Sequence, residues 1–416
     1  MMTGTLRHLY TSWVCLVVLT QTVGAGQILI APGQAWEDIA LQAKPGDEII
    51  LMPGTHRAVT IKNLRGTKRR PIIIRGLDAK NPSIIDAKTY GIRLVRPRYV
   101  NLSDLNIVGA LVNGILIDNS APPGKARKPD EGKEPDEPYG NIILKNIHVE
   151  RTGVRGQRHA IFLIGMANIR IEACRITGWA GSGIEIVGCT EITIRETTFT
   201  GLKDFAQLSG VRIRAGSTNV EVSTSRFENC GLSGVCVGGA SNLNEFFPKP
   251  DPKAQEGSIY EARQVRIDRN TFLGGATAIT MTHCERAEIW RNTIIRPEYY
   301  VFCLIQTHNN ELVGPTRRCT IGGNLISWQK EDLVKFFLID DEVDLKTLKM
   351  DPNLWWTNES AQSLLRLGQI PADTRIQQIF DVDPKLNQEF YPTNLRANGF
   401  GAFPIKIVRH SGINSQ

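Results

Sequence analysis

The sequence contains few of the residues that usually mark a metal site or a reactive thiol. Its 416 residues include 8 cysteines and 7 histidines, and no two cysteines form a Cys-x-x-Cys pair. Zinc sites built from cysteine use ligands at such close spacings. The sequence therefore predicts no metal site and names no cofactor.

Long hydrophobic runs are also missing after the first 25 residues. Within residues 1–25, Arg7 and His8 precede the short apolar run 13–20, and Val23-Gly24-Ala25 fits the small-residue rule for signal cleavage. The run is too short for a stable membrane span. We therefore expect a signal peptide at 1–25 and a soluble mature protein that is secreted or periplasmic, without a membrane span.

Export permits disulfides, but seven cysteines remain after cleavage, so at least one thiol stays unpaired. Packing is the expected role of Cys174 and Cys319, which occupy column positions shared with small or apolar residues. Cys230 and Cys236 flank one turn and could pair.

Dense basic runs interleaved with aromatic residues are absent as well. The formal net charge is +7, and lysines and arginines are scattered among acids. This pattern excludes a nucleic-acid partner and gives a mild bias towards anionic ligands, acidic polysaccharides among them. We expect a monomer.

What is present is a repeat. A nine-residue pattern with alternating apolar residues returns at intervals of 23, 28, 45 and 22 residues, the longest of which contains the stretch 239–262. The pattern has no helical periodicity, and a second alternating run follows each copy. Its clearest copies are residues 168–176, 191–199, 219–227, 264–272 and 286–294. This arrangement predicts an all-β solenoid of stacked parallel strands, in which equivalent positions form columns.

Three sets of columns support this interpretation. The first is inward and apolar, the second lies between the inward positions and must face outward, and the third is small and polar at a turn. The inward columns are Ile184, Val211, Val235, Ile279 and Ile186, Ile213, Val237, Met281. The outward column is Glu185, Arg212, Cys236, Thr280. The turn column is Cys174, Thr197, Ser225, Asn270, Asn292, Asn324.

The solenoid is expected to form a single domain over residues 26–416. A short amphipathic helix at 34–44 is expected to cap its N-terminal end, and two stretches, 120–138 and 239–262, read as insertions. The periodicity weakens after Trp328, which predicts an irregular C-terminal cap over about 329–416.

Residues 45–86 (PGDEIILMPGTHRAVTIKNLRGTKRRPIIIRGLDAKNPSIID) resemble the N-terminal coils of the chondroitinase B and alginate lyase family. With the repeats and the tail at 383–403, nearly the whole mature chain resembles exported right-handed parallel β-helix proteins. The resemblance implies carbohydrate as the ligand. Lyases, hydrolases, epimerases and adhesins share this architecture, so it does not select among them.

The chain departs from that family where its catalysis would lie. The family carries a Glu-x-Glu pair for calcium and a nearby catalytic lysine, whereas the comparable stretch 226–242 has neither. Arg212-Ile213-Arg214 resembles the Arg-Ile-Lys motif of polygalacturonase-type hydrolases, but Gly181-Ser182-Gly183 lacks the histidine of their Gly-His-Gly motif. Neither mechanism transfers to this chain.

Candidate chemistry is therefore sought on the outward face. Eliminative cleavage of a uronic-acid polymer needs a cation, a base and an acid. The catalytic candidates are Arg212 as cation, His159 or Lys203 as base and Tyr260 as acid, and the substrate-binding candidates are Arg158, Glu185, Asp204, Arg214 and His283.

Several of these residues have structural alternatives. Glu185 and Arg212 could form a surface ion pair worth under about 1 kcal/mol. His159 could be a solvated turn residue, His283 could simply bond backbone, and Tyr260 could anchor the second insertion.

The expected function is binding of an acidic polysaccharide, with lyase-type β-elimination if the protein is catalytic. The alternative is a non-catalytic carbohydrate-binding or cell-envelope structural protein. A hydrolase or epimerase is the third possibility, for which Glu185 and Asp204 are the plausible carboxyl pair.

Overall fold

The structure is a computed structural model that describes residues 26–78, 80–119, 138–251, 253–308, 310–329, 335–357 and 377–403. The predicted signal peptide at 1–25, and all of the predicted insertion at 120–138 except Pro138, lie outside the described residues.

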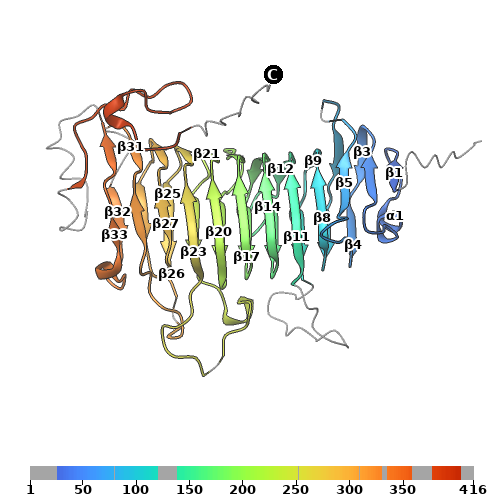
Figure 1. The fold of residues 1–416 in the computed structure, drawn as a ribbon, viewed down its shortest axis with the longest axis horizontal. Coiled ribbons are helices and arrows are strands. Elements are labelled where there is room, and N and C mark those ends of the chain that lie inside the picture. The colour runs from blue at the N-terminus through green and yellow to red at the C-terminus, as the bar shows by residue number, and fades with distance from the viewer. Residues whose placement is uncertain are drawn as a thin grey trace, which may run out of the picture.

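The chain winds into a long solenoid whose wall consists of three parallel sheets, here named A, B and C (Figure 1). Each full coil contributes one strand to each sheet, in the order A, B, C. In Figure 1, sheet A faces the viewer and the coils succeed one another from β1 on the right to β33 on the left.

The strands have the following bounds. Sheet A contains β1 (Gln27–Ile30), β2 (Glu48–Leu51), β5 (Ile72–Gly76), β8 (Arg98–Ser103), β11 (Gly140–Lys145), β14 (Ala167–Glu172), β17 (Thr190–Arg195), β20 (Ser217–Ser223), β23 (Ala262–Asp268), β26 (Cys284–Glu285), β27 (Glu288–Trp290), β30 (Thr320–Gly322) and β33 (Lys349–Met350). Sheet B contains β3 (Gly54–Arg57), β6 (Ser83–Asp86), β9 (Leu105–Val108), β12 (His148–Thr152), β15 (Arg175–Trp179), β18 (Thr198–Thr200), β21 (Arg226–Glu228), β24 (Thr271–Leu273), β28 (Thr293–Ile295), β31 (Leu325–Ser327) and β34 (Leu354–Trp356). Sheet C contains β4 (Val59–Lys62), β7 (Tyr90–Val95), β10 (Asn113–Asp118), β13 (His159–Ile164), β16 (Ser182–Val187), β19 (Ser209–Arg214), β22 (Ser233–Gly238), β25 (Thr277–Thr282), β29 (Tyr300–Leu304) and β32 (Lys335–Ile339).

The predicted register of sheet C is confirmed. Ile184 pairs with Val211, Val211 with Val235 and Val235 with Ile279, and all four side chains are fully buried in one core. β-Branched and aliphatic side chains suit such stacked inward positions, since the fixed pleat places every second residue inside.

The predicted turn column is also confirmed at the corner between sheets A and B. The backbone amide of Asn270 donates to the side-chain oxygen of Asn292 at 2.9 Å, and the amide of Asn292 donates to Asn324 at 2.9 Å. The same ladder continues to Asn353 and then to Gln378. Each buried amide at the bend is thereby satisfied by the coil that follows.

Both ends of the solenoid differ in detail from the sequence pattern. The helix α1 (Glu37–Leu41) packs Ala40 into the core as the expected N-terminal cap, but strand β1 precedes it and already belongs to sheet A. At the other end, regular strands continue beyond Trp328 as far as β34. The irregular segment 377–403 includes the short 3₁₀ turn η4 (Leu395–Ala397); two others, η1 (Leu243–Glu245) and η2 (Leu345–Thr347), lie in connections between sheets C and A.

Candidate functional site

The connection at residues 239–262, which leads from sheet C to sheet A, is fixed against the solenoid by a buried carboxylate. Glu261 is fully buried and accepts hydrogen bonds from the amides of Ala215 at 2.7 Å and Ser241 at 2.5 Å. Phe246 of the same connection packs with Val187 on the outer side of sheet C. This part of the outer face is therefore covered, and Figure 1 shows the connection leaving the lower edge of the solenoid.

Arg214 and Glu185 lie under this cover and form a buried ion pair. Arg214 Nε donates to Glu185 Oε1 at 2.6 Å, and its Nη1 donates to Glu245 at 3.1 Å and to Ser241 at 3.0 Å. The second Glu185 oxygen accepts from Ser182 at 2.6 Å. The expected surface pair of Glu185 with Arg212 is wrong, because Glu185 is fully buried and its ionic partner is Arg214.

The electrostatics of this pair follow from its burial. Burial alone would raise the pKa of Glu185, but His159, the Arg214 and Arg212 guanidinium groups and the Ser182 hydroxyl together hold it below its ordinary value. Burial would lower the pKa of Arg214, yet Glu185 and Glu245 raise it. Both groups are therefore ionised, and Arg214 joins the 239–262 connection to sheet C.

His159 also belongs to this buried cluster. Its side chain is 3% exposed, so the alternative of a solvated turn residue is wrong. Its Nδ1 accepts the amide of Ser182 at 3.1 Å, which leaves the proton on Nε2. Burial lowers the pKa of His159 more than the nearby Glu185 raises it. The ring is thus neutral, and its Nδ1 lone pair is occupied by a backbone amide.

Beyond the cover, the outer face of sheet C is hollowed into a groove of about 450 Å³, named here the sheet-C groove. It crosses β19, β22, β25 and β29. Leucine, tyrosine and small side chains form most of its surface. The lining residues are Leu208, Ser209, Arg212, Leu232, Ser233, Cys236, Ala276, Thr277, Thr280, Tyr299, Tyr300, Cys303 and Ile305.

Arg212 is the one sequence-predicted site residue that lines this groove. It lies on the same outward face as Arg214, two residues earlier on β19, yet the two guanidinium groups differ. Among the described residues, no hydrogen bond or ion pair reaches the Arg212 guanidinium, and its Nε is buried without a partner. A donor in that state is ready for an anionic or carbonyl acceptor.

The other predicted residues lie elsewhere. Lys203 and Asp204 are exposed in the connection between β18 and β19, and Arg158 lies in the connection before β13. Tyr260 is 2% exposed between the guanidinium groups of Arg263 and Arg317, whose carbon atoms lie 4.7 and 4.9 Å from its ring centre. This packing agrees with its alternative role as an anchor for the connection.

His283 bonds backbone, as its structural alternative predicted. Its Nδ1 donates to the carbonyl of Gly314 at 3.0 Å, and its Nε2 accepts the amides of Thr307 at 3.1 Å and His308 at 2.9 Å. Burial lowers the pKa of His283, so the ring is neutral. Its hydrogen bonds hold the connection that leaves β29.

The described cysteines are all free thiols, including Cys230 and Cys236. Cys284 and Cys319 on neighbouring coils come closest, with their sulfur atoms 3.9 Å apart. Within the described ranges, no three His, Cys, Asp or Glu side chains gather as metal ligands would. No helix in the described part of the chain has the length and hydrophobicity to cross a membrane.

Most of the groove lining was not anticipated from the sequence, including its two aromatic residues, Tyr299 and Tyr300. Tyr300 pairs with Thr277 of β25, so it continues the column of Ser209 and Ser233 by one more coil. Tyr299 is 52% exposed at the mouth of the groove. Extending the outward columns past residue 294, where the clear repeats end, would have identified both.

Comparison with known proteins supports the architecture. A family model described as a right handed beta helix region matches residues 140–324. A search of curated protein sequences gave no match. Among solved structures, the alginate lyase from Paenibacillus sp. str. FPU-7 is similar at 15% identity, with a TM-score of 0.50 over 79% of this chain and 98% of that chain.

Other similar structures have lower scores. The pectate lyase Pel9A is 11% identical, with a TM-score of 0.48 over 86% of this chain and 78% of that chain. The Dettilon tailspike protein is 11% identical, with a TM-score of 0.45 over 73% of this chain and 62% of its own, so this chain spans less than two thirds of it. The chain is therefore a right-handed parallel β-helix, similar in fold to polysaccharide lyases.

Proposed function

We propose that this protein binds an acidic polysaccharide along the sheet-C groove, with Arg212 as the contact for a sugar carboxylate. The observation that carries this proposal is the Arg212 guanidinium at the groove, whose Nε is buried without a hydrogen-bond partner. Leaving a buried donor unsatisfied costs about 1–3 kcal/mol, and a bound carboxylate would recover that cost through charge-assisted hydrogen bonds.

The remaining lining suits the rings of a sugar chain. Tyr299, Tyr300, Leu208 and Leu232 offer aromatic and aliphatic surfaces against which the apolar faces of pyranose rings can pack. The groove crosses four strands, which corresponds to roughly 14 Å at the usual strand spacing. That length accommodates a short extended stretch of polymer, and the positive net charge of the chain favours an anionic one.

Binding without cleavage is the version that the lining favours. Elimination needs a base and an acid beside the cation. The described lining residues include no histidine, lysine or carboxylate, and burial raises the pKa of the Cys236 and Cys303 thiols to about 11. Lyase-type elimination is the second candidate, and it rests on the two tyrosines that line the same groove as Arg212, three strands away at the start of β29, whose phenols are the available proton acceptors and donors.

Titration calorimetry against alginate, pectate and chondroitin sulfate tests the proposal. We expect one polymer to bind, and Arg212→Ala to weaken that binding about 10–100-fold, since a hydrogen-bonded charge contributes about 1.5–3 kcal/mol. Arg170→Ala is the matched control, because Arg170 is an exposed arginine on sheet A. Equal affinity of the Arg212 and Arg170 variants, or binding of none of the polymers, contradicts the proposal.

The same mixtures distinguish binding from cleavage. Elimination creates unsaturated uronate ends that absorb in the ultraviolet, so a rising absorbance would establish the lyase candidate. In that case Tyr299→Phe or Tyr300→Phe should abolish the signal while leaving the affinity largely intact. A flat absorbance with measurable binding supports the non-catalytic version.

A further inference from the structure

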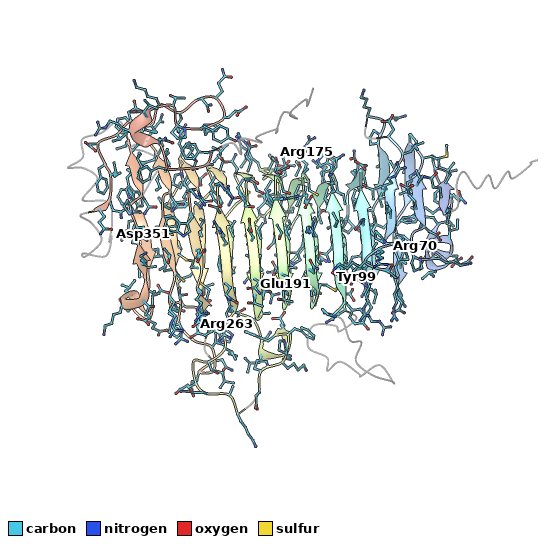
Figure 2. All side chains as sticks on the ribbon, in the orientation of Figure 1. Arg70, Tyr99, Arg175, Glu191, Arg263 and Asp351 are labelled. Carbon is cyan, nitrogen blue, oxygen red and sulfur yellow. The ribbon has the colours of Figure 1, made fainter. Side chains whose placement is uncertain are left out.

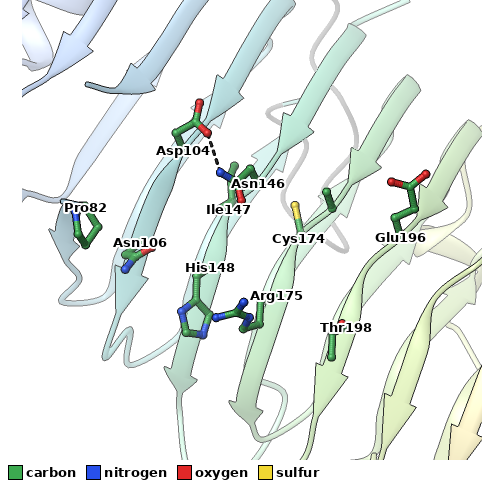
Figure 3. A pocket seen from close by; sticks show the side chains of 11 residues that line it. Pro82, Asp104, Asn106, Asn146, Ile147, His148, Cys174, Arg175, Glu196 and Thr198 are labelled. Atoms are coloured by element: carbon green, nitrogen blue, oxygen red, sulfur yellow. Dashed lines mark hydrogen bonds between the residues drawn. The ribbon is translucent and has the colours of Figure 1, made fainter. Parts of the chain in front are cut away.

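A second groove lies at the corner between sheets A and B, away from the sheet-C groove. Its volume is about 400 Å³, and polar side chains from successive coils line it (Figure 3). We name it the sheet-B groove. Its lining residues are Pro82, Asp104, Asn106, Asn146, Ile147, His148, Ala173, Cys174, Arg175, Glu196 and Thr198.

One column of this groove presents one polar side chain per coil. Asn106, His148, Arg175 and Thr198 occupy equivalent positions on β9, β12, β15 and β18. Such positions repeat about every 4.8 Å along the solenoid axis, close to the length of one pyranose unit in an extended glycan. Figure 3 shows the His148 ring and the Arg175 guanidinium side by side on neighbouring strands.

The same column is occupied by the protein itself further along the solenoid. Arg226, two strands after Arg175, forms an ion pair with Glu228, and its guanidinium carbon lies 5.3 Å from the ring centre of Phe390 in the C-terminal segment. Arg175 has no such ion pair or aromatic cover among the described residues. The groove is thus the part of the column that residues 377–403, the described part of the C-terminal segment, do not cover.

Its floor is open because of one small residue. Asn146, Ala173 and Glu196 occupy equivalent turn positions on successive coils, all with positive φ near 50°. Asn146 donates to Asp104 at 2.7 Å, whereas Ala173 has no side chain beyond Cβ. Space therefore remains between Asn146 and Glu196, and Pro82 lines one end of it.

The charges of the lining indicate the ligand class. Asp104 and Glu196 are acidic, Arg175 is basic, and burial lowers the pKa of His148, so the imidazole is neutral at neutral pH. This surface does not favour a polyanion. Amide, carboxylate, guanidinium, imidazole and hydroxyl groups instead provide donors and acceptors in the mixture that sugar hydroxyls require.

We propose that the sheet-B groove is a second saccharide site, which takes a neutral, hydroxyl-rich glycan running along the solenoid axis. It is independent of the sheet-C groove. Figure 2 shows Arg175 at the upper edge of the solenoid and Arg263, beside the 239–262 connection, at the lower edge.

The test fills the groove without disturbing the fold. Ala173→Asn extends a side chain into the open floor, and asparagine tolerates positive φ better than alanine does, so the melting temperature should stay equal or rise. Full-length protein is titrated calorimetrically with cellohexaose, xylohexaose, mannohexaose and maltohexaose. We expect at least one to bind, Ala173→Asn and Arg175→Ala each to weaken it at least about tenfold, and Arg212→Ala to leave it unchanged.

Three results would overturn the inference. The first would be that none of the four oligosaccharides binds. The second would be that the Ala173→Asn protein binds the oligosaccharide as tightly as the natural protein does, and the third that Arg212→Ala removes the binding. The last result would place the neutral glycan in the sheet-C groove. Failure of the acidic polymers to bind while Ala173→Asn still weakens a neutral one would refute only the function proposed for sheet C.

Discussion

Replacing Arg214 by alanine should destabilise the protein far more than replacing Arg212, although the two arginines face the same way on one strand. Arg214→Ala removes the guanidinium that lies 2.6 Å from Glu185, whose side chain is fully buried. Breaking a buried ion pair from one side costs about 3–5 kcal/mol, because a buried charge is left uncompensated. The Ser182 hydroxyl still bonds Glu185, so we expect the lower end, about 3 kcal/mol.

The matched variant Arg212→Ala removes the same charge from a guanidinium that has no hydrogen-bond or ion-pair partner among the described residues. Its free energy of unfolding should therefore stay equal or rise, because the variant removes a buried donor that lacks a hydrogen-bond partner. Urea unfolding, followed by circular dichroism, measures both variants, and equal slopes allow the midpoints to be compared directly.

A double variant isolates the cause. If the uncompensated carboxylate is responsible, Arg214→Ala combined with Glu185→Gln should regain part of the lost stability, because a neutral amide is cheaper to bury than a charge. Equal midpoints for the two single arginine variants would refute the argument. A double variant no more stable than Arg214→Ala would show that the links from Arg214 to the 239–262 connection, and not Glu185, carry the effect.

Other features of the fold, and the export that the sequence predicts, can be tested separately. Ile213→Asp should cost more than about 4 kcal/mol by placing a charge in the core, and a small change in the urea midpoint would show that the strand register is wrong. Asn292→Ala should cost about 1–3 kcal/mol by leaving the buried Asn270 amide without its acceptor; an unchanged midpoint would argue against the ladder. Burial lowers the pKa of His159 and His283, so the unfolded chain binds more protons than the folded one once the pH falls below about 6.5. The free energy of unfolding should therefore be full above that pH and decline below it. Unfolding midpoints that do not change between about pH 7 and pH 5 would contradict this. Sequencing of the exported protein should find its N-terminus near Gly26, whereas an intact Met1 in the soluble cell fraction would remove the argument for export.

The periodic part of the fold could be predicted from the sequence because each coil must bury the same inward positions and satisfy the same backbone groups at its turns. A position that is β-branched or aliphatic in four successive copies has to face inward, and Ile213 with its column does so. The turn column could be predicted equally well, since each buried backbone amide at the bend needs a hydrogen-bond acceptor from the next coil. Because the coils repeat, equivalent positions can be compared within one sequence, whereas a single isolated strand offers no second copy for comparison.

The irregular parts could not be predicted in this way. Arg212 and Arg214 have the same residue type, strand and face, yet Glu245 reaches only Arg214. Glu245 belongs to the 239–262 connection, which has no periodicity, so no column shows which coil it will cover. Tyr260, chosen from the same stretch as a proton donor, is enclosed by Arg263 and Arg317 for the same reason.

The position of that connection also bears on the ligand site proposed for sheet C. The outward column of sheet C reads Phe162, Glu185, Arg212, Cys236, Thr280 and Cys303 from coil to coil. The connection covers the first two positions, where Phe162 packs against its apolar side chains and the Glu185 carboxylate is buried with its own cation. Gly239 of the connection still lies against the Arg212 guanidinium, and the groove that begins at Arg212 has no carboxylate in its described lining. Glu185 already counters part of the Arg212 charge from within the protein. Under the proposed function, a uronic-acid polymer lying across sheet C would supply a further carboxylate at the edge of the open groove.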